Sequence, residues 1–188
     1  MIAYKFLSRG AVGPFSGFRW PTPAGGAPGA WVEAAGEIPA RGVHACRPAD
    51  LPYWIDEELW AAELAGDVHA TPHQLVASRG RLLEPIEAWR DLARAFGDDC
   101  AATLRERVDG GLAEGGVADE VAEQLRGYAA DAEACAKGGN SAVAAFIAAR
   151  ASALLAGDQA GFAAERRRQA AWLEQRLGGA TGSPPPRA

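Results

Sequence analysis

Within Ser78-Arg79-Gly80-Arg81-Leu82-Leu83-Glu84-Pro85-Ile86-Glu87-Ala88-Trp89, a strand pattern changes to a helix pattern. Residues 74–83 alternate between two faces, which is the period of a strand. After Glu84 the apolar residues recur with the period of a helix, and Pro85 suits a first helical turn. This change predicts an α+β chain in which a small antiparallel or mixed β-sheet domain, residues 1–83, precedes an antiparallel helical bundle, residues 84–178.

The first 83 residues contain five short strand candidates separated by glycine and proline turns. They cover residues 3–7, 31–34, 43–46, 59–64 and 74–83. Residues 10–29 are rich in glycine and proline and carry Phe15, Phe18 and Trp20, so we expect a loop pinned to the domain by its aromatic rings. Gly66-Asp67 predicts a turn after the fourth strand. Asp50 predicts the N-cap of a helical turn that contains Pro52.

The residues after Glu84 predict helices joined by short connections, which makes neighbouring helices antiparallel. Gly97-Asp98-Asp99 predicts a break in the first helix, and the second is expected near residues 117–136. Asn140 and Ser141 cap the third, and Gly157-Asp158 joins it to the fourth. We expect four large side chains to lie in the core: Trp89, Phe146, Leu154 and Leu173. Residues 179–188 are expected to form a disordered tail.

Charge and composition exclude several classes of function. The formal net charge is −5 and the pI is near 5.3, and no stripe of lysine and arginine interleaves with aromatic residues, so we expect no nucleic-acid partner. No apolar run approaches the roughly 18 residues that span a bilayer, so no membrane partner is expected. The odd count of three cysteines, without a CxxC pair or an export signal, predicts a soluble, reduced, cytoplasmic protein.

His44 and Cys46 are the most informative candidate site residues, because residues two apart on a strand share one face. Three interpretations are open: a metal-binding pair, a Cys–His nucleophile, or a structural histidine beside a buried thiol. His69 and His73 could supply further metal ligands, but the intervening Thr71-Pro72 indicates a loop that does not pair them. We therefore expect no metal and no cofactor, a buried Cys46, and a His44 that is hydrogen-bonded across the sheet.

If the chain has a ligand-binding site, His44, Tyr53, Trp54 and Arg79 are its predicted members, and no catalytic residue can be assigned. Aromatic and basic groups around a histidine are typical of a ligand site. Arg79 and Arg81 share a strand face and could bind a phosphate or carboxylate, although pairing with Glu63 or Asp67 on a neighbouring strand is favoured. The acidic run at residues 56–58 resembles a catalytic carboxylate cluster, but three adjacent acids are more typical of a solvated turn.

Residues 3–83 also resemble an uncharacterised domain family of phage and actinobacterial proteins. The resemblance rests on Lys5-Phe6, Gly17-Phe18, a Gly-(Phe/Val)-His-Ala-Cys-x-x-Pro motif, a following tyrosine and a basic strand at residues 78–81. Here the motif is Gly42 to Cys46, with Pro48 after it, and the tyrosine is Tyr53. An alanine-rich helical tail resembles those that follow this domain elsewhere. The resemblance implies a β-rich domain and no particular activity.

Two classes of function are compatible with these features. The first is a binding module without catalytic activity, whose partner is an unknown protein or small molecule. The alternative is an enzyme that binds a nucleotide-like ligand on a β-domain remotely like the ADP-ribosyltransferase fold, an analogy at fold level. A deep pocket in which His44, Tyr53 and an arginine converge would favour the enzyme, whereas a flat aromatic patch would favour the module.

Overall fold

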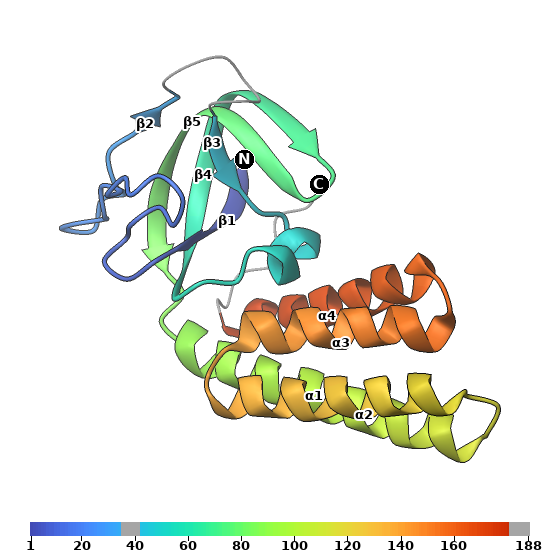
Figure 1. Ribbon diagram of the computed structural model, residues 1–188. Helices are drawn as coiled ribbons and strands as arrows, with labels where there is room; N and C mark the ends of the chain where they lie inside the picture. Colours follow the sequence, from blue (N-terminus) through green and yellow to red (C-terminus); the bar gives the residue numbers. More distant parts are fainter. Residues whose placement is uncertain (35–41, 181–188) are drawn as a thin grey trace. The chain divides into compact units, whose positions relative to one another are not determined.

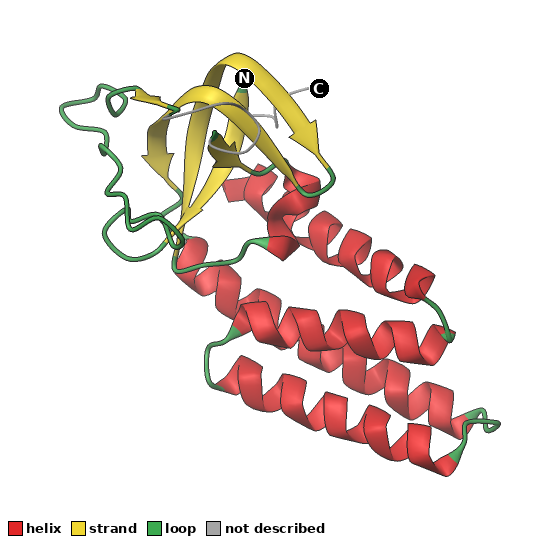
Figure 2. Cartoon of the chain, turned by 45° about the horizontal axis from the view of Figure 1, so that its top comes forward, coloured by secondary structure: helices red, strands yellow, loops and turns green. Residues whose placement is uncertain are grey.

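The computed structural model describes residues 1–34 and 42–180, with side chains described as far as Gly178. Five strands occupy the first part of the chain and four long helices follow, so the predicted α+β class is confirmed (Figure 1, Figure 2). The chain divides into two compact units, Met1–Arg90 with Glu174–Ala188, and Asp91–Leu173. We call them the β unit and the helical unit. Among the described helices, none combines the length and the apolar character that a membrane crossing requires.

The β unit is a small antiparallel sheet that closes on itself (Figure 1). Its strands are β1 (Ile2–Leu7), β2 (Val32–Glu33), β3 (Val43–Ala45), β4 (Glu58–Thr71) and β5 (Gln74–Pro85). β1 pairs with β4, β4 with β5, and β5 with both β2 and β3. A bridge between Tyr4 and Cys46 joins the end of β3 back to β1, so these hydrogen bonds form a complete circuit.

The long hairpin of β4 and β5 corrects the predicted turn at Gly66-Asp67. Here the ladder carries a register shift between Ala65 and Val68, and β4 continues to Thr71. Gly66 adopts φ of +73°, a conformation that suits a glycine at a bulge. The chain reverses instead at Pro72-His73, where Thr71 pairs with Gln74. The bulge bends the hairpin, and the later turn lengthens it.

A short 3₁₀ helix, η1 (Pro48–Tyr53), follows β3 and corrects the prediction that Asp50 is its N-cap. Arg47 occupies the N-cap, and Asp50 lies three residues later with only 3% of its surface exposed. The Asp50 carboxylate accepts hydrogen bonds from the backbone N–H, Nε and Nη2 of Arg47. Arg47 Nη2 also donates to the Thr71 carbonyl at 2.9 Å, which ties η1 to the end of the hairpin.

The helices are α1 (Trp89–Ala113), α2 (Asp119–Lys137), α3 (Ser141–Ala156) and α4 (Gln159–Ala180). The predicted break at Gly97-Asp98-Asp99 is wrong, because α1 is continuous there. A Cβ at Gly97 would lie 2.8 Å from the Ser141 hydroxyl, so this glycine permits a close approach of α3 instead of ending a helix. α4 continues to Ala180, so residues 179 and 180 of the predicted tail are helical, and residues 181–188 lie outside the described residues.

The predicted core is half correct. Trp89 and Leu173 are buried, with 2% and 0% of their surface exposed, whereas Phe146 is 49% exposed and Leu154 is half-buried. The prediction for Phe146 fails because α3 packs through its small residues. Its buried positions are Ser141, Ala144, Ala145, Ala148, Ala149, Ala151 and Ser152. Helices that approach this closely leave no room for a large side chain between them.

Candidate functional site

The candidate site is a row of aromatic rings on the β unit, which we call the aromatic row: Phe15, Trp54, His73 and Tyr53. Three segments contribute to it, namely the 10–29 loop, the end of η1 and the hairpin turn. Phe15 meets Trp54 edge-on at 6.4 Å between ring centroids, and Tyr53 stacks on His73 at 4.0 Å and 18°. Phe15 is 89% exposed, His73 is also exposed, and Tyr53 and Trp54 are half-buried.

Two rings of the row are held by the hairpin turn. Trp54 Nε1–H donates to the carbonyl of His73, whose own ring is the one stacked on Tyr53. The hydrogen bond from Arg47 to Thr71 holds η1 against the same turn. Tyr53 and Trp54 are therefore fixed to the scaffold before any ligand arrives, which reduces the entropy lost on binding.

His44 lies on β3 opposite Val76 of β5, close to the start of the hairpin's return strand. Its Nδ1 is 3.0 Å from Gln74 Oε1, so the predicted hydrogen bond across the sheet is confirmed. Gln74 directly follows His73 of the aromatic row in the chain. The backbone carbonyl of His44 also accepts a hydrogen bond from Lys5 Nζ at 2.6 Å.

The described contacts of Arg79 are with Glu33 of β2 and the neighbouring Trp31. Its guanidinium lies 4.8 Å from the centre of the Trp31 ring and 4.0 Å from a carboxylate oxygen of Glu33. Arg81 lies over the same ring at 4.5 Å and pairs with Glu63 at 2.6 Å, as the favoured interpretation of this strand face predicted. Both arginines are thus engaged by the sheet and by Trp31.

Cys46 lacks the properties of a nucleophile or a metal ligand. It is buried, as predicted, with 5% of its surface exposed. Burial raises the pKa of its thiol to about 12, and Asp50 adds to this effect, so the thiol is protonated at neutral pH. The reactive form of cysteine is the thiolate. Among the described residues, no three histidine, cysteine or acidic side chains lie in a group that could hold a metal ion.

The acidic run at residues 56–58 organises the turn after β1. Glu58 Oε1 and Oε2 accept hydrogen bonds from the backbone N–H groups of Gly10 and Ala11, and Oε2 also accepts from Trp60 Nε1. Gly10 and Ala11 both have positive φ, 79° and 57°, and for alanine this conformation is strained. Partial burial would raise the pKa of Glu58, but these hydrogen bonds outweigh it and hold the pKa below its ordinary value. The cluster is therefore structural.

We predict that Glu58→Gln lowers the free energy of unfolding by about 1–3 kcal/mol, because backbone donors lose a charged acceptor. A carboxylate whose pKa is lowered in the folded state stabilises above its unfolded pKa, and this contribution disappears as the pH falls through the folded value. The difference from wild type should therefore shrink below about pH 4.5. Urea denaturation at several pH values measures it. Glu87→Gln, at an exposed carboxylate that accepts no hydrogen bond from the described residues, is the control, and an equal loss in both variants would contradict the assignment.

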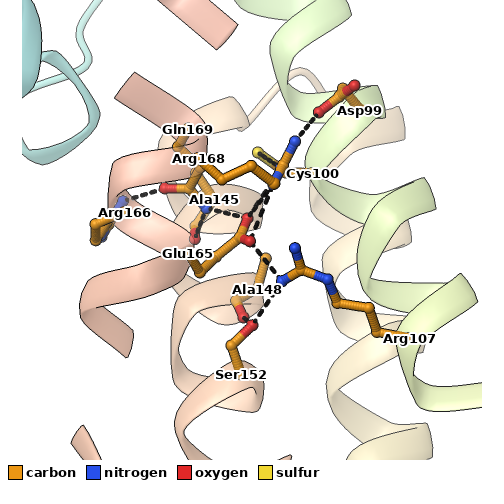
Figure 3. Close-up of polar contacts among 10 residues, drawn as sticks. All are labelled: Asp99, Cys100, Arg107, Ala145, Ala148, Ser152, Glu165, Arg166, Arg168 and Gln169. Atoms are coloured by element: carbon orange, nitrogen blue, oxygen red, sulfur yellow. Dashed lines mark hydrogen bonds and ion pairs between the residues drawn. The ribbon is translucent and has the colours of Figure 1, made fainter. Parts of the chain in front are cut away.

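The helical unit contains a second polar cluster, drawn in Figure 3. Glu165 is buried, and its carboxylate accepts from Arg107 Nη1 at 2.7 Å, Arg168 Nη2 at 2.9 Å and Gln169 Nε2 at 3.0 Å. Arg168 also donates to Asp99 at 2.6 Å. Two acids and two arginines from α1 and α4 thus balance one another. Such a network fixes how helices pair.

Two of the predicted site residues, Tyr53 and Trp54, belong to the aromatic row, whereas His44 lies outside it and Phe15 and His73 were not among the predicted site residues. Phe15 was expected to pin its loop, yet it is the most exposed large apolar residue described. The sequence marks His73 only by the neighbouring Pro72, a residue common in turns. That mark identifies His73 as a site residue only once the hairpin turn is known to lie at Pro72-His73. No protein-family model, curated protein or solved structure matches the chain, so the likeness to phage and actinobacterial proteins stays a prediction.

Proposed function

We propose that the chain is a binding module without catalytic activity, and that its aromatic row binds an extended, proline-containing segment of a partner protein. The observation that carries this proposal is the exposure of Phe15, at 89%, in edge contact with an anchored Trp54. Large apolar rings exposed together are typical of interaction sites. A fixed row of such rings offers binding surface at a low cost in side-chain entropy.

The kind of partner follows from the shape and chemistry of the row. Aromatic-lined surfaces bind proline-rich segments because the polyproline II conformation is already extended and presents proline rings that pack on aromatic faces. Trp54 uses its N–H for the His73 carbonyl, so what its ring offers a ligand is its apolar surface. Tyr53 and His73 present stacked rings in the same way. An apolar, extended ligand fits these groups better than a small polar one.

The same contacts give the enzyme alternative less support. It needs an arginine beside His44 and Tyr53, whereas Arg79 lies over Trp31 and near Glu33. It also needs an activated group, whereas the Cys46 thiol has a raised pKa and the carboxylate of Glu58 is occupied by backbone N–H groups. The described residues also form a shallow hollow, but its lining residues, among them Ala101, Arg105 and Glu133, belong to α1 and α2 and include neither His44 nor Tyr53.

We predict that Trp54→Ala weakens binding of an N-acetylated proline decamer by at least about tenfold, because truncating an aromatic anchor at an interface costs more than about 1.4 kcal/mol. The measurement is an NMR titration of the ¹⁵N-labelled full chain. Wild-type shifts should concentrate at residues 13, 15–16, 53–54 and 73–74. Phe18→Ala is the matched control. Phe18 is an exposed aromatic residue of the loop that carries Phe15, but its ring contacts Trp20 and not the aromatic row.

Two results would overturn the proposal. The first is a wild-type chain whose spectrum does not respond to the decamer at millimolar concentration. The second is equal binding by Trp54→Ala and Phe18→Ala, which would show that the decamer contacts exposed rings without distinction. Melting temperatures of both variants, read by circular dichroism, separate lost binding from lost folding.

A further inference from the structure

We infer that the outer face of α3, together with Phe162 of α4, binds one amphipathic helix of a partner protein that carries an acidic residue beside its apolar stripe. We call this surface the α3 face: Val143, Phe146, Arg150 and Phe162. α3 lacks the polar outer side that a surface helix normally has. Its exposed residues are Val143, Phe146, Arg150 and Ala156, and Val143 and Phe146 are 39% and 49% exposed.

The inner face of α3 already makes the contacts that the bundle needs. Ser141 lies against Gly97 of α1, where an added Cβ would come within 2.8 Å of its hydroxyl. A Cβ at Gly161 of α4 would come closer still to the Ser152 carbonyl. The Ala145 carbonyl accepts a hydrogen bond from Gln169 Nε2 at 2.9 Å. Because the close packing between helices uses these small residues, the large residues on the opposite side, Val143 and Phe146, are not needed to pack the bundle.

The rings of the α3 face are held in place. Phe146 and Phe162 meet edge-on at 6.2 Å between centroids. Beneath them the guanidinium of Arg166, which is 5% exposed, lies 5.7 Å from one ring centre and 5.3 Å from the other. Arg166 Nη1 donates to Gln169 Oε1, which anchors it to α4. The guanidinium lies within cation–π distance of both rings and helps to hold them in place.

The size of the α3 face favours a single helix over a second copy of the chain. Val143 and Phe146 together expose on the order of 150 Å² of side chain, whereas a stable interface buries about 800 Å² on each partner. Val143, Phe146 and Arg150 lie at positions i, i+3 and i+7 of α3, so they form one stripe along the helix. A partner helix that docks by its own apolar stripe can lie along such a stripe.

The positive charge of the α3 face favours a partner helix that carries negative charge. Arg150 is the one charged residue in the sequence of α3. It is exposed, and no hydrogen bond or ion pair joins it to another part of the chain within residues 1–34 and 42–180. A glutamate or aspartate flanking the stripe of the partner helix would meet Arg150 and favour that partner over a basic one.

Two designed 15-residue helical peptides test this inference on the ¹⁵N-labelled full chain. Both carry the same leucine stripe, flanked in one peptide by glutamate and in the other by lysine. We expect the acidic peptide to shift resonances of residues 141–150 and 159–166 saturably, and the basic peptide to bind at least about tenfold more weakly. Phe146→Glu should weaken binding of the acidic peptide by a similar factor. Arg150→Glu should make the chain bind the basic peptide more tightly than the acidic one.

Ile2→Glu, at a 43% exposed residue of the β unit, is the matched control and should leave binding unchanged. Equal affinity for both peptides, or unchanged binding by Phe146→Glu, would overturn the inference. Self-association in sedimentation velocity that Phe146→Glu abolishes would overturn it in favour of a second copy. Because this surface lies on the helical unit, its failure leaves the proposal for the aromatic row unaffected.

Discussion

Replacing Glu165 with alanine is expected to lower the free energy of unfolding by about 2–4 kcal/mol, because a buried carboxylate that accepts several hydrogen bonds is removed and Gln169 loses its charged acceptor. The Glu165 side chain is 1% exposed and serves both Arg107 and Arg168. Asp99 would remain as a partner for Arg168 at 2.6 Å, which limits the loss from that arginine.

Chemical denaturation followed by far-ultraviolet circular dichroism measures this loss, since the helices dominate the signal. Glu123→Ala on α2 is the control, because its side chain is exposed, and it should change stability by less than about 0.5 kcal/mol. Glu165→Gln keeps the shape and one acceptor oxygen, so its loss should lie between the two. A loss below 1 kcal/mol for Glu165→Ala would show that the network contributes little to the fold.

The parts of the fold that the sequence predicts are those with local signals. Asn140 was expected to cap α3, and its side chain accepts a hydrogen bond from the Val143 N–H. Gly157 was expected at a joint, and its φ of 71° closes α3. Gly97 and Gly66 were misread, because a glycine serves equally to end an element, to form a bulge or to admit a neighbour. Which of these applies depends on segments far away in the sequence.

The core of α3 could not be predicted for a related reason. Periodicity identifies a core by its large apolar residues, and α3 has apolar residues on every side. Phe146 therefore looked internal, although alanines fill the buried side. Only the approach of Gly97 and Gly161 shows that the neighbouring helices are too close to accommodate a phenylalanine.

Only part of the candidate site was predicted, because the wrong position of the hairpin turn changed which side chains were expected to meet. His44, Tyr53 and Trp54 belong to local segments that sequence motifs identify. His73 joins them only because the hairpin reverses at Pro72-His73, six residues after the expected turn. The same hairpin pairs Arg79 with Glu33 of β2, away from His44. Strand register decides which side chains meet, and register depends on the turn.

Replacing Lys5 is expected to change how the free energy of unfolding depends on pH. Its amine donates to the His44 carbonyl at 2.6 Å and lies 4.4 Å from the centre of the Trp20 ring. Burial lowers its pKa from 10.5 to about 8, against a smaller opposing effect of Cys46. Lys5→Met keeps the length of the side chain and removes the charge.

The sign of the effect follows from which state binds the proton more tightly. Between about pH 8 and 10.5 the unfolded chain holds the Lys5 proton and the folded chain releases it, so the stability that this group confers rises with pH. The free energy of unfolding of wild type, minus that of Lys5→Met, should therefore increase by roughly 3 kcal/mol from pH 7.5 to 10.5. Taking the difference cancels the titration of Tyr4, whose pKa burial raises. It does not cancel that of Cys46, because the charges of Lys5 and Cys46 act on each other, so both proteins should carry Cys46→Ala. Lys137→Met, at an exposed lysine, should show a flat difference, and an equally flat Lys5 curve would mean that its amine is solvated in the folded chain.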